Sequence, residues 1–125
     1  MSSSFVEYRG HGFWSRDLFL EPVLALLAER IGDSANQDWL KDLRDHWRNQ
    51  SSGDFRGWIH PNLDEFITSE DRREAILRLL NIITSQPDVT SEVRETANLF
   101  AALLRDEIKT DASSPLDYMV GEPKR

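Results

Sequence analysis

Cysteine is absent from the 125 residues of this chain. Its absence excludes disulfide frameworks, thiolate nucleophiles, zinc fingers and iron–sulfur clusters, and it fits a reducing compartment. Apolar runs are short as well: residues 23–28 fall far below the roughly 20 residues that a membrane helix needs. The amino-terminal residues lack the basic start and the apolar stretch of a secretory signal. We therefore expect a cytoplasmic protein without a membrane segment.

Positive charge is also scarce, because 15 Lys and Arg stand against 22 Asp and Glu, for a formal net charge of -7. Nonspecific nucleic-acid binding depends on Lys and Arg displacing counterions from phosphates, so this balance disfavours it. The partner that the charge favours is a basic protein. A hydrophobic content of 39%, with four Trp, is too high for intrinsic disorder. Because domains typically contain roughly 100–150 residues, we predict one domain over residues 1–125.

Helical periodicity dominates the rest of the sequence. Apolar residues recur at helical spacing in four segments, namely residues 22–31, 37–49, 69–84 and 90–108. Pro22 fits the first turn of its helix, where a missing N–H is harmless. Ser69, and Thr90 or Ser91, stand where helix caps are expected. No segment of useful length alternates as a strand does. The prediction is an all-α bundle of four or five helices.

Three parts of the chain carry no helical period. Residues 1–14 are rich in aromatic residues and glycine without regular spacing, and we predict an irregular arm or a short strand there. Residues 54–62 contain glycine and proline between aromatic residues, which predicts a loop that packs against the body. Residues 111–125 are rich in Ser, Pro and Gly and are expected to form a partly ordered tail.

Acidic residues concentrate in the second half of the chain, while every Trp and His lies in the first half. Several carboxylates begin predicted helices, where they favour the helix dipole, but those near the carboxyl end do not. Such a cluster accelerates association with a basic partner, although solubility alone is an alternative explanation. Trp39 and Trp47 are expected in the core, unlike the Trp residues in glycine-flanked segments. The predicted partner-binding residues are Trp14, Trp58, Asp106, Glu107, Asp111 and Asp117.

A basic stripe runs along the predicted helix 37–49, where Lys41, Arg44 and Arg48 share a face. Guanidinium groups of this kind can hold a phosphate or a carboxylate. Aspartates interleave with the stripe, so local charge pairs worth about 0.2–0.5 kcal/mol each are the alternative explanation. The candidate ligand or anion contacts are Arg44, Arg48, Arg56 and His60.

Histidines are the remaining candidates for chemistry. None of His11, His46 and His60 has the spacing of a metalloprotease motif, so each is expected to have a local hydrogen-bonding role. The alternative is a small metal- or ligand-binding protein that uses His11 and His60 with Asp17 or Asp64. Nucleophile elbows and phosphate-binding loops are absent from the sequence. We therefore predict no enzyme activity, no catalytic residue, no cofactor and no bound metal.

In its general character the chain resembles the small acidic helical immunity proteins that bacteria pair with secreted toxins. The features that carry the resemblance are a Cys-free single domain, acidic residues late in the chain and aromatic residues outside the helices: Glu92, Glu95, Asp106, Glu107, Trp14 and Trp58. The resemblance implies stoichiometric inhibition, in which an acidic or aromatic surface occludes the basic active site of a toxin. It implies neither turnover nor a cofactor, and it assigns no role to a single residue.

Overall fold

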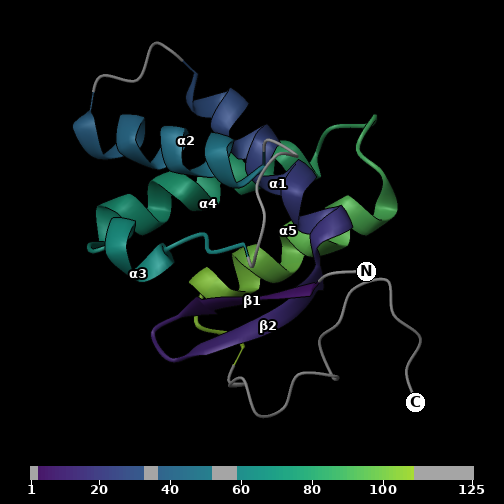
Figure 1. The fold of residues 1–125 in the computed structure, drawn as a ribbon, viewed down its shortest axis with the longest axis horizontal. Helices are drawn as coiled ribbons and strands as arrows, with labels where there is room; N and C mark the ends of the chain where they lie inside the picture. Colours follow the sequence, from purple (N-terminus) through teal and green to yellow (C-terminus); the bar gives the residue numbers. More distant parts are fainter. Residues whose placement is uncertain (1–2, 33–36, 52–58, 109–125) are drawn as a thin grey trace.

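A computed structural model describes residues 3–32, 37–51 and 59–108. Two strands come first, β1 (Ser3–Tyr8) and β2 (His11–Arg16). The helices of the described residues are α1 (Asp17–Ile31), α2 (Asp38–Gln50), α3 (Leu63–Phe66), α4 (Glu70–Thr84) and α5 (Ser91–Leu104). In Figure 1 the strands lie along one side of the molecule, with α5 packed against them and α1, α2 and α4 beyond it. The predicted helical character is confirmed, but the two strands mean that the protein is mainly α and not the all-α bundle that the sequence predicts.

The amino-terminal segment, predicted as an irregular arm or a short strand, is an antiparallel β-hairpin of two strands. Arg9 and Gly10 form its two-residue turn with φ angles of 54° and 84°, the positive values that a type I′ turn requires. Val6 and Tyr8 face the core, and Val6 pairs with the buried Phe13 of β2. The segment forms a hairpin because this turn aligns two short strands, which bury Val6, Tyr8 and Phe13 against the core.

Helix α1 begins earlier than the sequence predicts. It starts at Asp17, so Pro22 lies inside the helix and not in its first turn. A proline at that position lacks the N–H that would bond to the Leu18 carbonyl. Leu18 is 58% exposed, so water can reach its carbonyl, while Leu20 is fully buried and extends the apolar face of the helix. The helix therefore tolerates an internal proline on its solvent side.

The predicted caps of α4 and α5 are confirmed. The Ser69 hydroxyl accepts a hydrogen bond from the Arg72 N–H, and the Thr90 hydroxyl accepts one from the Val93 N–H, both at 3.3 Å. The last helix ends at Leu104, four residues before its predicted end.

Helix α5 ends early because Asp106 adopts a left-handed conformation with a φ angle of 61°. The Glu107 N–H then donates to the Ala102 carbonyl at 2.9 Å, which closes the helix in a Schellman motif. Ile108 lies beyond the helix yet is buried, as its periodic position predicts.

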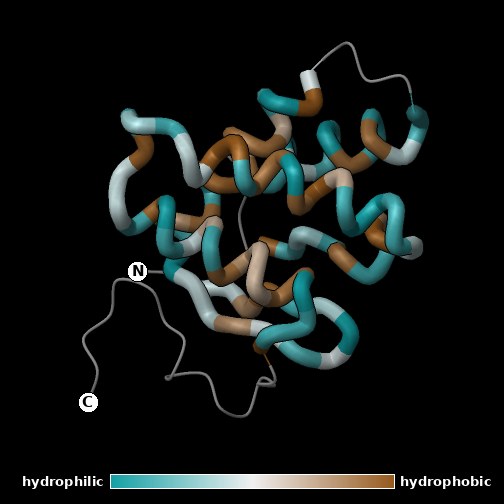
Figure 2. The backbone as a smooth tube through the Cα atoms, turned by 180° about the vertical axis from the view of Figure 1, so that it is seen from behind, coloured by the Kyte–Doolittle hydropathy of each residue, from teal (hydrophilic) through white to brown (hydrophobic). Residues whose placement is uncertain are grey.

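Aromatic side chains from three elements meet in the core. Phe13 of the hairpin and Trp47 of α2 both make edge-to-face contacts with Phe100 of α5, with ring centroids 6.5 Å and 6.2 Å apart. Figure 2 shows hydrophobic stretches alternating with hydrophilic ones along the helices, as expected when each helix buries one face. Across the described ranges, no helix combines the length and the apolar character that spanning a bilayer demands.

The geometry of the hairpin predicts how much stability three glycine variants lose, and in which order. Open space surrounds Gly10, so Gly10→Ala adds only the cost of a side chain at positive φ, and we expect a loss of about 1 kcal/mol in the free energy of unfolding. Gly10→Asn should lose less, because Asn tolerates this conformation. At Gly12 a Cβ would overlap the Val6 carbonyl oxygen, so Gly12→Ala should lose at least about 2 kcal/mol. Urea unfolding of the three variants measures the order, and equal losses would contradict the turn and the close approach.

Candidate functional site

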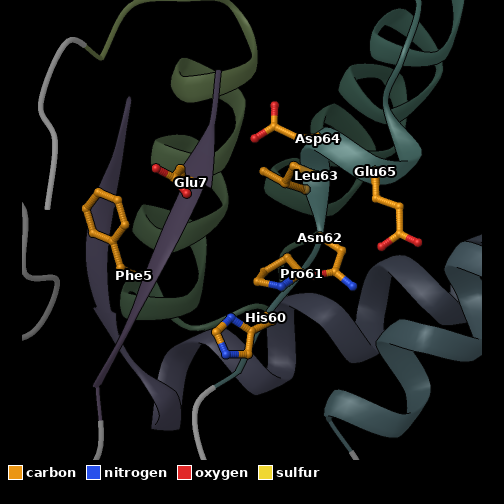
Figure 3. A pocket seen from close by; sticks show the side chains of 8 residues that line it. All are labelled: Phe5, Glu7, His60, Pro61, Asn62, Leu63, Asp64 and Glu65. Carbon is orange, nitrogen blue, oxygen red and sulfur yellow. The ribbon is translucent and has the colours of Figure 1, made fainter. Parts of the chain in front are cut away.

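A pocket of about 260 Å³ lies between the hairpin and the segment that leads into α3. Phe5 and Glu7 of β1 form one wall, and residues 60–65 form the other. Figure 3 shows Glu7 and Asp64 on opposite sides of the opening, with His60 and Pro61 at its lower end. The hairpin wall exists because Phe5 and Glu7 are on the strand face opposite to the buried Val6 and thus point away from the core.

Two hydrogen bonds hold the walls at a fixed offset. The buried Ser4 hydroxyl accepts a bond from the Ile59 N–H at 3.0 Å and donates one to Asp17 at 2.7 Å. Five residues further along each wall, the Arg9 N–H donates to the Asp64 carboxylate at 2.9 Å. Residues 59–64 therefore run beside β1 in the same direction, although side chains and not a backbone ladder join them.

Helix α2 fixes the wall opposite the hairpin through three side chains. Gln50 accepts a hydrogen bond from the His60 N–H at 2.7 Å, and His46 Nε2 lies 2.6 Å from the His60 carbonyl oxygen. The buried Trp47 indole donates to the Pro61 carbonyl at 2.9 Å. These bonds occupy the backbone groups of His60 and Pro61, so the His60 side chain is presented to the pocket on a fixed backbone.

The hairpin wall is stiffened by aromatic packing. The rings of Phe5 and Trp14, which are cross-strand partners, lie 5.4 Å apart at an interplanar angle of 56°. The Phe5 ring also covers Gly12, where an added Cβ would come within 2.8 Å of its Cζ atom. Glycine thus allows the ring to lie flat against the strand, and Trp14 supports it from the side.

The pocket is acidic. Glu7, Asp64 and Glu65 are exposed carboxylates at its opening, and none of the described residues that line it is Lys or Arg. The nearest cation along the chain, Arg9, has its guanidinium 5.1 Å from the centre of the Tyr8 ring. The pocket therefore offers hydrogen-bond acceptors and negative charge.

A separate ion pair lies at the start of α4. A hydrogen bond from Arg73 lowers the pKa of Glu70, against a smaller raising effect of desolvation, and the charges of Arg73 and Arg9 lower it further. The same hydrogen bond raises the pKa of Arg73. This pair neutralises its own charges and lies apart from the residues that line the pocket.

Part of the sequence-predicted site comes together here. His60 and Asp64 line the pocket, and Trp14 stands behind its Phe5 wall. His11 and Asp17 do not line it: Nδ1 of His11 is buried and has no hydrogen-bond partner among the described residues, and Asp17 binds Ser4. Within the described ranges, no three His, Asp or Glu side chains are grouped so that they could hold a metal ion.

Several arginine side chains donate to carbonyls at the ends of helices. Arg44, a predicted anion contact, donates to the Gly32 carbonyl at the end of α1 at 2.8 Å and pairs with Asp45. Arg94 in the same way donates to the Thr84 carbonyl at 3.0 Å. Arg72 lies 4.8 Å from the ring centre of the half-buried Trp39. Each of these guanidinium groups is therefore engaged within the fold, and each keeps its positive charge.

The remaining predicted residues are spread over other parts of the chain. Arg48 is exposed on α2. Asp106 and Glu107 are exposed just after α5, where Glu107 forms an ion pair with Arg105 at 3.1 Å. The predicted residues that lie outside the described ranges are Arg56, Trp58, Asp111 and Asp117.

A second hollow, of about 180 Å³, lies between α4 and α5. Leu77, Leu80 and Ala101 contribute its apolar surface, and Arg105 is its one charged lining residue. It lacks the concentration of like charge that distinguishes the hairpin pocket, which is the stronger candidate for a binding site.

Sequence reasoning missed Glu7 and Glu65. Glu7 lies just before the Arg9–Gly10 turn, and recognising that turn would have placed it on the outer face of a strand. Glu65 directly follows Asp64, which was already a candidate. No protein-family model, curated protein or solved structure matches this chain.

The Ser4 junction predicts a large effect for a small change. Ser4→Ala leaves the Ile59 N–H and the Asp17 carboxylate without this partner, so we expect a loss of about 1–3 kcal/mol in the free energy of unfolding. The matched control is Ser15→Ala, because Ser15 pairs with Ser4 across the hairpin and is equally buried, but donates to the adjacent Arg16 carbonyl. Urea unfolding compares them, and equal losses would show that the junction adds no stability.

Proposed function

We propose that the protein is a non-enzymatic binding protein, and that the pocket between β1 and residues 60–65 is where a basic partner protein docks. The charge of the pocket carries this proposal: among the described residues, three exposed carboxylates line it and no Lys or Arg does. Carboxylates at the opening of a concave surface attract a basic partner before contact and select its orientation during docking.

Inhibition of a basic toxin is the binding role that we favour. An acidic surface that blocks a basic active site acts through shape and charge, which this pocket offers, and needs no turnover. The resemblance to bacterial immunity proteins points the same way, and the absence of cysteine supports the cytoplasm as the compartment. Asp106 and Glu107 are the competing docking surface, but the ion pair of Glu107 with Arg105 reduces their net charge.

Removal of pocket charge is expected to weaken partner binding. In the double variant Glu7→Gln/Glu65→Gln, both side chains keep their size and lose their charge, and neither wall loses a described hydrogen bond. We expect its affinity for the partner to fall by at least tenfold, or about 1.4 kcal/mol, and its salt dependence to flatten. The measurement is affinity capture from the native lysate followed by calorimetry with the purified partner at low and high salt.

The matched control is Glu74→Gln/Glu95→Gln, which removes equal charge from exposed positions on α4 and α5. This control should bind the partner within twofold of wild type. A partner whose affinity is unchanged by the pocket variant contradicts the proposal. The proposal is also contradicted if only the variant Asp106→Asn/Glu107→Gln loses affinity for the partner, because the docking surface would then be at the end of α5.

A further inference from the structure

Among the described residues, the edge of β1 that faces the pocket has no partner strand. In a hairpin with a two-residue turn the flanking residues form a hydrogen-bonded pair, here Tyr8 and His11, and such pairs alternate along the strands. Phe5 and Glu7 belong to the non-hydrogen-bonded pairs that lie between these. Their N–H and C=O groups therefore point away from β2, to the outer edge of β1. The Arg9 N–H, two residues after Glu7, points to the same edge and donates a hydrogen bond to the Asp64 carboxylate.

The neighbouring segment does not complete this edge. The His60 N–H and the His60 and Pro61 carbonyls bond to side chains of α2, so they are turned away from β1. Among the bonds of the described residues, none joins the backbone of Phe5 or Glu7 to residues 59–64. With respect to the described residues, the Phe5 and Glu7 carbonyls therefore add two acceptors to a pocket that already contains carboxylates.

The walls of the pocket distinguish between kinds of cation. Phe5 and His60 both contribute rings to it (Figure 3), and the Phe5 ring is held in place by Trp14 and Gly12. A planar guanidinium can stack on such rings and still donate in its own plane to several acceptors, whereas an ammonium is a compact and strongly hydrated point charge. A volume of about 260 Å³ suits one long side chain and is below the roughly 300–1,000 Å³ of ligand pockets.

From these features we infer that the pocket is an arginine receptor: one arginine side chain of the partner enters between Phe5 and His60. Its guanidinium donates to the Glu7 and Asp64 carboxylates and to the Phe5 and Glu7 carbonyls at the β1 edge. This inference rests on the proposed function for the identity of the partner as a basic protein. It adds that arginine, and not positive charge in general, is what the pocket selects.

The test uses the full chain and three small probes: the acetylated amides of arginine, lysine and citrulline, where citrulline is the neutral analogue of arginine. Amide chemical shifts of the isotope-labelled protein are followed during titration at low salt. We expect the arginine probe to shift the Glu7 and Asp64 signals saturably and to bind at least fivefold more tightly than lysine. Citrulline should cause no saturable shift.

Two variants separate charge from stacking. Glu7→Gln should weaken arginine binding at least threefold, and Glu74→Gln should leave it unchanged. Phe5→Leu should reduce the preference for arginine over lysine to less than twofold by weakening arginine alone. If Phe5→Leu fails to fold, as its amide spectrum will show, His60→Ala tests the other ring with the same expectation.

Several results would overturn the inference: equal binding of arginine and lysine, binding of citrulline as tight as that of arginine, or saturable shifts only outside the pocket. If no probe binds while partner capture still depends on Glu7 and Glu65, the arginine inference fails and the proposed function stands. If arginine binds as expected but partner affinity ignores those carboxylates, the proposed function fails alone.

Discussion

The Trp47 indole connects the core of this protein to its pocket. Its ring packs edge-to-face on Phe100 in the centre of the molecule, and its N–H holds the Pro61 carbonyl at the pocket wall. A buried indole N–H needs a partner, and the carbonyl of a residue that itself lacks an N–H is a fitting one. His46 and Gln50 also contact the backbone of His60. They reach it because the Trp47 contact fixes how α2 is rotated about its axis. The position of residues 60–65, and hence the second wall, depends on this contact.

The chemistry of the pocket depends on which polar groups are used in hydrogen bonds within the fold and which stay on the surface. Helix ends use guanidinium groups as caps, which takes cations such as Arg44 and Arg94 away from the surface. The α2 side chains take up the backbone groups of residues 60 and 61, which prevents that segment from pairing with β1. Both arrangements satisfy buried polar groups, as a stable fold requires. Among the described residues, the second arrangement leaves a β1 edge without a partner strand beside a group of exposed carboxylates.

Local sequence signals were sufficient for the long helices. The caps at Ser69 and Thr90 and the apolar periodicity placed α4 and α5, because these signals act within a few residues. The hairpin was missed because an Arg–Gly turn is a weaker signal than Asn–Gly, and because Gly12 and Phe13 are both buried and interrupt the alternation. His60 and Asp64 were singled out by residue type, but Glu7 joins them only through strand register and tertiary packing, which no local pattern encodes.

The offset of the two walls also bears on how the molecule folds. Ser4 meets Ile59 and Arg9 meets Asp64, and each contact spans 55 residues of sequence. The hairpin closes across two residues, and hairpins form in roughly 1–10 μs, whereas contacts between distant residues must await closure of a long loop. One wall therefore forms early and the other arrives with the helical core. The complete pocket exists only in chains that have folded throughout, so a partner that binds it binds the native state and not the unfolded chain. Such binding stabilises the whole fold against unfolding and proteolysis.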